Sequence, residues 1–150
     1  MGVTTTQEYT SCIPAPRLFK AVAVESEVVP KAMPEAFKCI EVEGDVRVTK
    51  LPEGEFKYMK HRTDVLDINN HFCKYTLFEG DVLGDKLESV VHEVKYEASG
   101  NGCVVKATSH YHPKPGVVLN PEEINAGEVK AMGLYKAVEE YLLANPTVCA

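Results

Sequence analysis

The chain has 150 residues, of which 45% are hydrophobic and 25% charged, and its formal net charge is -6 at pH 7. This length predicts one domain with its own core, and no run of about 18 apolar residues predicts a membrane-spanning helix. Because no Lys- and Arg-rich cluster offsets the negative charge, tight binding of nucleic acid is not expected.

The N-terminal part of the chain predicts one strand followed by short helices. Residues 3–11 are rich in threonine and contain a tyrosine, which is typical of a strand, and two nearby prolines end it. Beyond these prolines, apolar residues recur at roughly helical spacing: they are Leu18, Phe19, Val22 and Val29. One or two short helices are therefore expected before the next strand.

Residues 36–112 predict an antiparallel meander, because strand-like segments alternate there with residues that tolerate turn dihedrals. The expected strands cover residues 37–42, 46–51, 55–68, 71–80, 87–99 and 102–112. Alternation is clearest in the last two, so one face is expected to be covered and the other solvated. The expected inner sets are Cys73, Tyr75 and Leu77; Val90, His92, Val94 and Tyr96; and Val105, Ala107, Ser109 and Tyr111.

The C-terminal helix is the best-marked element of the sequence. Asn120 is a good N-cap, Pro121 suits the first helical position, and Glu123 stands three residues after the cap as in a capping box. The helix is expected to end near Asn145. Its apolar stripe recurs at steps of three and four residues and includes Ile124, Gly127, Ala131, Leu134, Tyr135, Val138, Tyr141 and Leu142. The predicted fold class is thus α+β, with a long helix packed against a curved antiparallel sheet.

The expected inner face of the sheet is unusually polar and aromatic for a solid core. Tyr58, Tyr75 and His92 are among its members, and the small residues Gly127 and Ala131 lie opposite on the helix. Buried hydroxyl and imidazole groups need hydrogen-bond partners, since an unpaired one costs about 1–3 kcal/mol. Two interpretations follow: either these groups bond to one another in a satisfied core, or the small helix residues leave room for a small-molecule pocket.

The sequence has five cysteines, without a CxxC pair and without histidine at zinc spacing. An odd number in this arrangement argues against both a disulfide framework and a metal site. A reducing compartment and cytoplasmic localisation are therefore expected, and neither a metal nor a cofactor is expected.

Several segments, in the same order, resemble one protein family. The segments "IPAPRLFKA", "VPKAMPEAFKCIEVEGD", "KYTLFEGDVLGDKLESVVHEVK" and "KAVEEYLLANP" are similar to the plant intracellular pathogenesis-related proteins of the birch-pollen major allergen family. The resemblance covers nearly the whole chain, and it is closer to the St John's wort member once proposed to couple phenols than to the birch allergen itself. It implies a seven-stranded antiparallel sheet wrapped round the long helix, a helix-grip or START-like fold, with two short helices and a large internal cavity.

The same resemblance implies a defence protein that carries or stores amphipathic plant molecules, such as flavonoids, cytokinins, abscisic acid and alkaloids. A monomer, or at most a weak dimer, is expected. Carried over by position, the cavity would be lined by Phe56, Tyr58, His61, Cys73, Tyr75, Leu77, Val90, His92, Val94, Ile124, Gly127, Ala131 and Leu134. In the family the position of Cys73 is often tyrosine and that of His61 often acidic, so the polar contacts of this cavity should be its own.

One segment departs from the family pattern. Members usually carry a glycine-rich loop after "EGD", whereas residues 43–45 run directly into "VRVTKL". A two-residue type II′ hairpin at Gly44 would put Val42 on the same face as Arg47 and turn Val46 to the other side. Either a glycine-rich segment is missing from the chain, or a bulge corrects the pairing.

Catalytic and receptor-like alternatives stay open. Ribonuclease activity, attributed to some family members, would use Glu88, Glu139 and Tyr141, whereas the other interpretation is a solvated Glu139 beside a packing Tyr141. His61 and His92 could act as general bases or donors toward a phenol, or be satisfied core residues, and a third metal ligand is not evident. A condensing enzyme of the norcoclaurine-synthase type and a hormone receptor that inhibits a phosphatase are further alternatives, whose full residue sets the sequence does not place.

Overall fold

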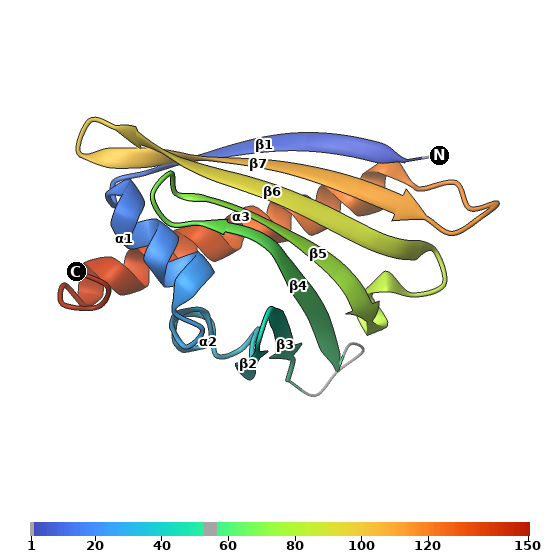
Figure 1. Ribbon diagram of the computed structural model, residues 1–150, viewed down its shortest axis with the longest axis horizontal. Coiled ribbons are helices and arrows are strands. Elements are labelled where there is room, and N and C mark those ends of the chain that lie inside the picture. The colour runs from blue at the N-terminus through green and yellow to red at the C-terminus, as the bar shows by residue number, and fades with distance from the viewer. Residues whose placement is uncertain (1, 53–56) are drawn as a thin grey trace.

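The computed structural model describes residues 2–52 and 57–150 as a curved sheet with a long helix behind it (Figure 1). The strands are β1 (Val3–Ser11), β2 (Cys39–Glu43), β3 (Val46–Lys50), β4 (Tyr58–Asp67), β5 (Phe72–Gly80), β6 (Leu87–Ser99) and β7 (Gly102–Pro113). The helices are α1 (Ala15–Phe19), the π-helical η1 (Lys20–Val24), α2 (Val28–Ala32), the 3-10 turn η2 (Asp81–Leu83) and α3 (Pro121–Ala144).

Within the described residues, the strands form one seven-stranded sheet in the order β1-β7-β6-β5-β4-β3-β2, and every neighbouring pair is antiparallel. Figure 1 shows α3 running behind the sheet, with α1 and α2 at the end where the C-terminus lies. The α+β class, with seven strands, two short helices and one long helix, is confirmed. The long β6–β7 and β1–β7 pairings form the frame on which α3 lies.

Helix α3 begins where the sequence predicts. The Asn120 side chain accepts a hydrogen bond from the backbone N–H of Glu122 at 2.9 Å, which satisfies one of the free N–H groups of the first turn. The reciprocal half of the predicted capping box is wrong, because the Glu123 carboxylate pairs instead with Lys86 at 3.2 Å. At the other end, Arg17 donates to the carbonyl of Leu142 at 2.8 Å, which ties α1 to the last turn of α3.

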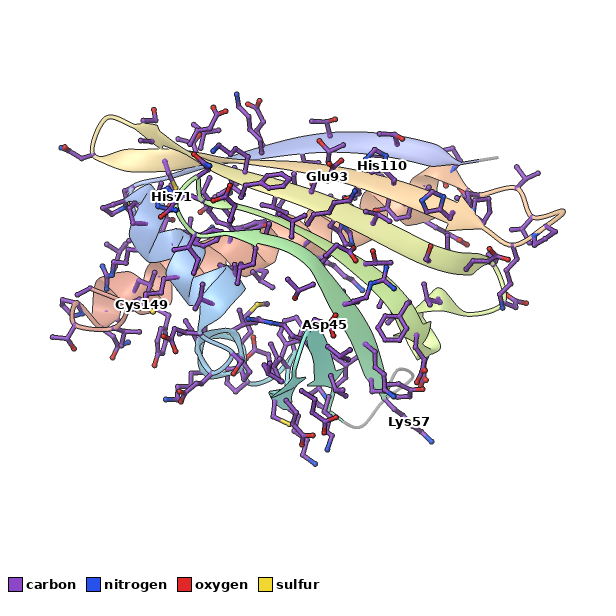
Figure 2. The ribbon with its side chains drawn as sticks, viewed as in Figure 1. Asp45, Lys57, His71, Glu93, His110 and Cys149 are labelled. Carbon is purple, nitrogen blue, oxygen red and sulfur yellow. The ribbon has the colours of Figure 1, made fainter. Side chains whose placement is uncertain are left out.

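The expected alternation in β6 is present. Val90, Val94 and Tyr96 are at most 3% exposed, while the charged residues between them reach solvent. On the outer face, Nε2 of His110 and the Glu93 carboxylate are 2.8 Å apart, on the side of the sheet away from α3 (Figure 2). The period-two pattern therefore assigns the two faces of β6 correctly.

The β2–β3 hairpin decides which side chains enter the molecule at that edge of the sheet. Gly44 has a φ of 61° and Asp45 keeps a negative φ, as a type II′ turn requires. The two strands pair without interruption, so Val42 lies opposite Arg47 and the alternative of a corrective bulge is wrong. Arg47 consequently points inward, where it donates to η1, and Val46 takes the outer face.

The core is densest where α1, η1, α2 and the C-terminal half of α3 meet the sheet. Leu18, Val138 and Leu142 have no exposed surface there, and Phe19 and Tyr96 meet edge to face at 5.4 Å. Burial of each such side chain contributes about 1.5–3 kcal/mol to folding. No helix among the described residues combines the length and the apolar character needed to cross a membrane.

Candidate functional site

The strands β5 and β6 bring most of the predicted site residues into one patch of the inner face. Cross-strand pairing joins Cys73 to Val94, Tyr75 to His92, and Leu77 to Val90. Cys73, Leu77, Val90 and Val94 are buried, whereas the aromatic pair between them is only partly covered. We refer to these six residues, together with His61, as the inner patch.

A shift in register between β4 and β5 determines which residues of β4 join this patch. His61 pairs with Leu77, and Lys60 pairs with Glu79, so Phe78 is the extra residue on β5. The Tyr58 hydroxyl donates to Glu79 at 2.9 Å on the outer, solvated face. The prediction that Tyr58 lines the interior is therefore wrong, and its neighbour Met59 packs against the buried inner residues instead. The predicted Phe56 lies outside the described residues.

Three aromatic rings of the inner patch are in direct contact. The ring of His61 meets Tyr75 edge to face at 5.4 Å between centroids, and Tyr75 lies 5.1 Å from His92 at an angle of 35°. His92 is also held from the side, because its Nδ1 is 2.8 Å from the Ser109 hydroxyl. These contacts fix the orientation of the rings toward the interior.

Both histidines lie in a poorly solvated environment. Burial, and then electrostatic repulsion from His92 and Arg47, lowers the pKa of His61 to about 4. Burial, and then His110, lowers the pKa of His92 to about 4. At neutral pH both imidazoles are therefore uncharged, and they are weak general bases.

Several polar atoms in and beside the inner patch nevertheless remain accessible to solvent. Neither the His61 ring nitrogens nor the Tyr75 hydroxyl has a hydrogen-bond partner within the part of the chain that the structure describes, and the same holds for Nε and Nη1 of Arg47. Among those residues, the one buried side-chain polar atom with neither partner nor solvent access is Gln7 Oε1. The unpaired atoms of His61, Tyr75 and Arg47 are thus deep in the molecule yet remain reachable by water.

Arg47 also belongs to the site, although the alternation of apolar residues in the long strands does not predict it. It pairs with His61 across β3 and β4, and its Nη2 donates to the carbonyls of Ala23 at 2.6 Å and Val24 at 3.2 Å. The signal for it in the sequence is the hairpin at Gly44, which puts Arg47 on the face of Val42.

The predicted residues of α3 are not packed as a continuous stripe. Ile124 and Leu134 are half-buried, whereas Gly127 and Ala131 are exposed, and a Cβ on Gly127 would meet no atom within 4 Å. The helix contacts β1 through another face, on which the carboxylate of Glu128 accepts a hydrogen bond from Thr5. The side of α3 that carries Gly127 and Ala131 is therefore free of close packing.

Glu139 has a structural position. Its carboxylate accepts hydrogen bonds from Tyr9 at 2.9 Å, from the Ser11 hydroxyl at 2.8 Å and from the Cys12 N–H at 3.1 Å. Glu139 is partly exposed, but it also joins α3 to β1, so it is more than a solvated residue of a charged helix face. Ser11, which binds Glu139, pairs with Cys103 on β7, and Cys103 pairs with Ala98 on β6. Glu88 lies at the opposite end of β6 from Ala98, so the carboxylates of Glu88 and Glu139 are roughly 30 Å apart. They do not form an acid–base pair.

The rest of the described surface offers a recess and no metal site. A surface recess of about 180 Å³ between α2 and the C-terminal residues is lined by Lys20, Lys31, Tyr141 and Cys149 among others, and it contains none of the residues predicted to line the cavity. Within residues 2–52 and 57–150, no three His, Cys, Asp or Glu side chains gather in a way that could hold a metal ion.

Comparisons with known proteins cover the whole fold. The sequence profile described as "Pathogenesis-related protein Bet v 1 family" matches residues 1–145. The chain is 51% identical to pathogenesis-related protein STH-2 of Solanum tuberosum, with all of both chains covered, and 44% identical to the major allergen Mal d 1 of Malus domestica, with 97% of this chain and 98% of the relative covered. The STH-2 alignment spans 156 positions against the 150 residues of this chain, so the relative has internal residues that this chain lacks.

The solved structures agree. The crystal structure of Ara h 8.0201 is 33% identical, with a TM-score of 0.86 and coverage of 97% of this chain and 100% of that one. Norcoclaurine synthase from Thalictrum flavum, in complex with dopamine and hydroxybenzaldehyde, has a TM-score of 0.76 and covers 97% of this chain and 88% of its own. At 21% identity, this second likeness concerns the fold alone. The resemblance to the St John's wort member stays a prediction.

Proposed function

Because the chain belongs to the pathogenesis-related protein Bet v 1 family, we propose that it binds hydrophobic or amphipathic small molecules between the inner patch and α3. In this proposal the protein is a carrier or reservoir in the cytoplasm and acts as a monomer. Flat plant metabolites such as flavonoids, cytokinins, abscisic acid and alkaloids are the candidate ligand classes.

One observation carries the proposal: polar atoms of His61 and Tyr75 are largely buried, have no hydrogen-bond partner among residues 2–52 and 57–150, and are still reachable by water. In a solid core such atoms would be paired or sealed. On the helix side, Gly127 is exposed and a Cβ there would meet no atom within 4 Å, and the buried Leu77 and Val90 supply apolar side chains on the sheet side. A few polar groups within apolar walls are the usual composition of a small-molecule site.

Hydrophobic burial would supply most of the affinity. Two or three aromatic rings bury roughly 300–400 Å², and at about 25 cal/mol per Å² this contributes about 8–10 kcal/mol. Micromolar affinity corresponds to about 8 kcal/mol. Because most of this energy does not depend on direction, selectivity among flat apolar molecules is expected to be low.

Binding is proposed rather than turnover for a chemical reason. A general base works best when its pKa is near the working pH, and the pKa values of His61 and His92 are about 4. Glu139 is engaged in three hydrogen bonds to β1 and the adjoining residue. These groups are better suited to hold a ligand or the fold than to transfer protons at neutral pH.

Titration with a fluorescent naphthalene sulfonate dye tests the proposal. Leu134→Trp should fill the proposed space and weaken dye binding about tenfold or more. Leu143→Trp is the matched control, since Leu143 is on the same helix and 57% exposed. Equal dye binding by wild type and Leu134→Trp, with both variants folded, would contradict an interior site. Native mass spectrometry of the purified protein would identify a co-purifying ligand.

A further inference from the structure

We propose that the interior contains an anion subsite, formed by Arg47 with His61 and Tyr75, which selects aromatic or apolar ligands that carry a carboxylate. This inference rests on the proposed function and specifies the chemical class of its ligand. It follows from the position of the Arg47 guanidinium, from its N–H groups that donate to no protein atom, and from the lack of a carboxylate beside it within the described residues.

The two-residue turn at Gly44 places the cation. Because β2 and β3 pair without a bulge, Arg47 shares the inner face with Val42 and stands beside His61. A turn longer by one residue would send Arg47 to the outer face and bring Val46 inward. The charge is therefore a consequence of the short hairpin, and it lies beside the aromatic rings of the inner patch.

The Arg47 guanidinium is anchored but not saturated. Its Nη2 donates to the carbonyls of Ala23 and Val24 at the end of η1, which holds the planar group in place. The Nε and Nη1 groups have no partner within the described part of the chain, and they are not sealed from water. Arginine presents its donors in a rigid fork that matches a carboxylate. The unused edge can therefore receive a ligand oxygen.

No protein carboxylate neutralises this cation among the described residues. Arg62, one residue further along β4 than His61, forms an ion pair with Asp64 at 2.7 Å on the outer face, whereas Arg47 has no such partner in the described part of the chain. Burial lowers the pKa of Arg47, which reflects the unfavourable desolvation of its charge. A partly buried cation without a counter-ion is unfavourable, so an anionic ligand would relieve this penalty on binding.

The neighbours of Arg47 suit the rest of such a ligand. The Tyr75 hydroxyl stays protonated, because burial raises its pKa well above the usual value, and it can donate to a second carboxylate oxygen. Beyond it, the rings of Tyr75 and His92 and the side chain of Leu77 offer a surface for a flat apolar body. The geometry thus favours an acid at one end of the ligand and a ring at the other.

A pair of isosteric probes tests this inference. The affinities of 2-naphthoate and of the uncharged 2-naphthamide are measured by fluorescence titration at pH 7 and low salt. For wild type we expect the acid to bind about tenfold more tightly than the amide. In Arg47→Met this preference should fall to about one, because the acid loses much more affinity than the amide does. Arg62→Met, the matched control on the outer face, should keep the wild-type preference.

The outcomes separate this inference from the proposed function. If wild type binds both probes equally, the anion subsite is refuted and interior binding stands. If wild type binds neither probe nor the naphthalene sulfonate dye, the proposed function itself fails. Should Arg47→Met not fold, as judged by far-UV circular dichroism, Arg47→Lys decides: it keeps the charge without the fork. The inference is supported if Arg47→Lys still binds 2-naphthoate more tightly than 2-naphthamide but by a smaller factor than wild type. The same factor as in wild type would contradict a role for the paired N–H donors of arginine.

Discussion

The carboxylate of Glu139 is expected to be one of the strongest single links between α3 and β1. Its oxygens accept hydrogen bonds from the Tyr9 hydroxyl, the Ser11 hydroxyl and the backbone N–H of Cys12. Burial alone would raise the pKa of Glu139, but the hydrogen bonds from Ser11, Cys12 and Tyr9 outweigh it and lower the pKa. The perturbation is Glu139→Gln, which keeps the shape of the side chain and removes its charge.

The expected loss can be estimated from these contacts. A hydrogen bond to a charged group contributes about 1.5–3 kcal/mol, against about 1 kcal/mol for a neutral one. Glutamine keeps one acceptor oxygen and turns an NH₂ group toward the remaining donors. The net loss in the free energy of unfolding should therefore be about 2 kcal/mol, which lowers the Tm of a 150-residue protein by about 4–8 °C.

Urea denaturation followed by far-UV circular dichroism measures this loss, and tyrosine fluorescence is a second probe because the chain has no tryptophan. The folded-state pKa of Glu139 is below its unfolded value, so its stabilisation is present above the unfolded pKa and disappears as the pH falls through the folded pKa. The difference between wild type and variant should shrink accordingly in acid. Glu140→Gln is the control, since Glu140 is exposed. A loss below about 0.5 kcal/mol for Glu139→Gln, equal to that of the control, would refute the reasoning.

Three further predictions concern stability. The pKa values of His61 and His92 are lowered from 6.5 to about 4 in the folded protein, so these histidines bind protons in the unfolded chain first as the pH falls. Between pH 6.5 and about pH 4 the free energy of unfolding should therefore drop by up to about 3 kcal/mol per histidine, as measured by urea denaturation at a series of pH values. Gly102→Ala should destabilise by about 3 kcal/mol in urea melts, because the new Cβ would lie 2.0 Å from the Ser11 carbonyl oxygen. Gly133→Ala, in the exposed middle of α3 with nothing within 4 Å of the new Cβ, should raise stability by about 1 kcal/mol, and an unchanged Tm would contradict this.

Local chemistry in the sequence determines the elements of this protein. Asn120 and Pro121 begin α3 through a cap that needs only neighbouring backbone groups. The alternation in β6 assigns Val90 and Val94 to the interior, because side chains of a strand point to opposite faces in turn. The turn at Gly44 follows from the freedom of glycine at positive φ. Each of these features depends on residues close together in the chain, so each can be inferred before any partner is known.

The tertiary structure alone decides which side chains meet. The register shift at Phe78, which puts Tyr58 outside, depends on how β4 pairs with β5 and not on the period of either strand. Glu139 is bonded to residues 127–130 positions away in the sequence, and Arg47 to the end of a helix 23 and 24 positions earlier. Periodicity gives the direction of a side chain relative to its own strand or helix. Whether that side chain finds a partner is settled only when distant segments pack together.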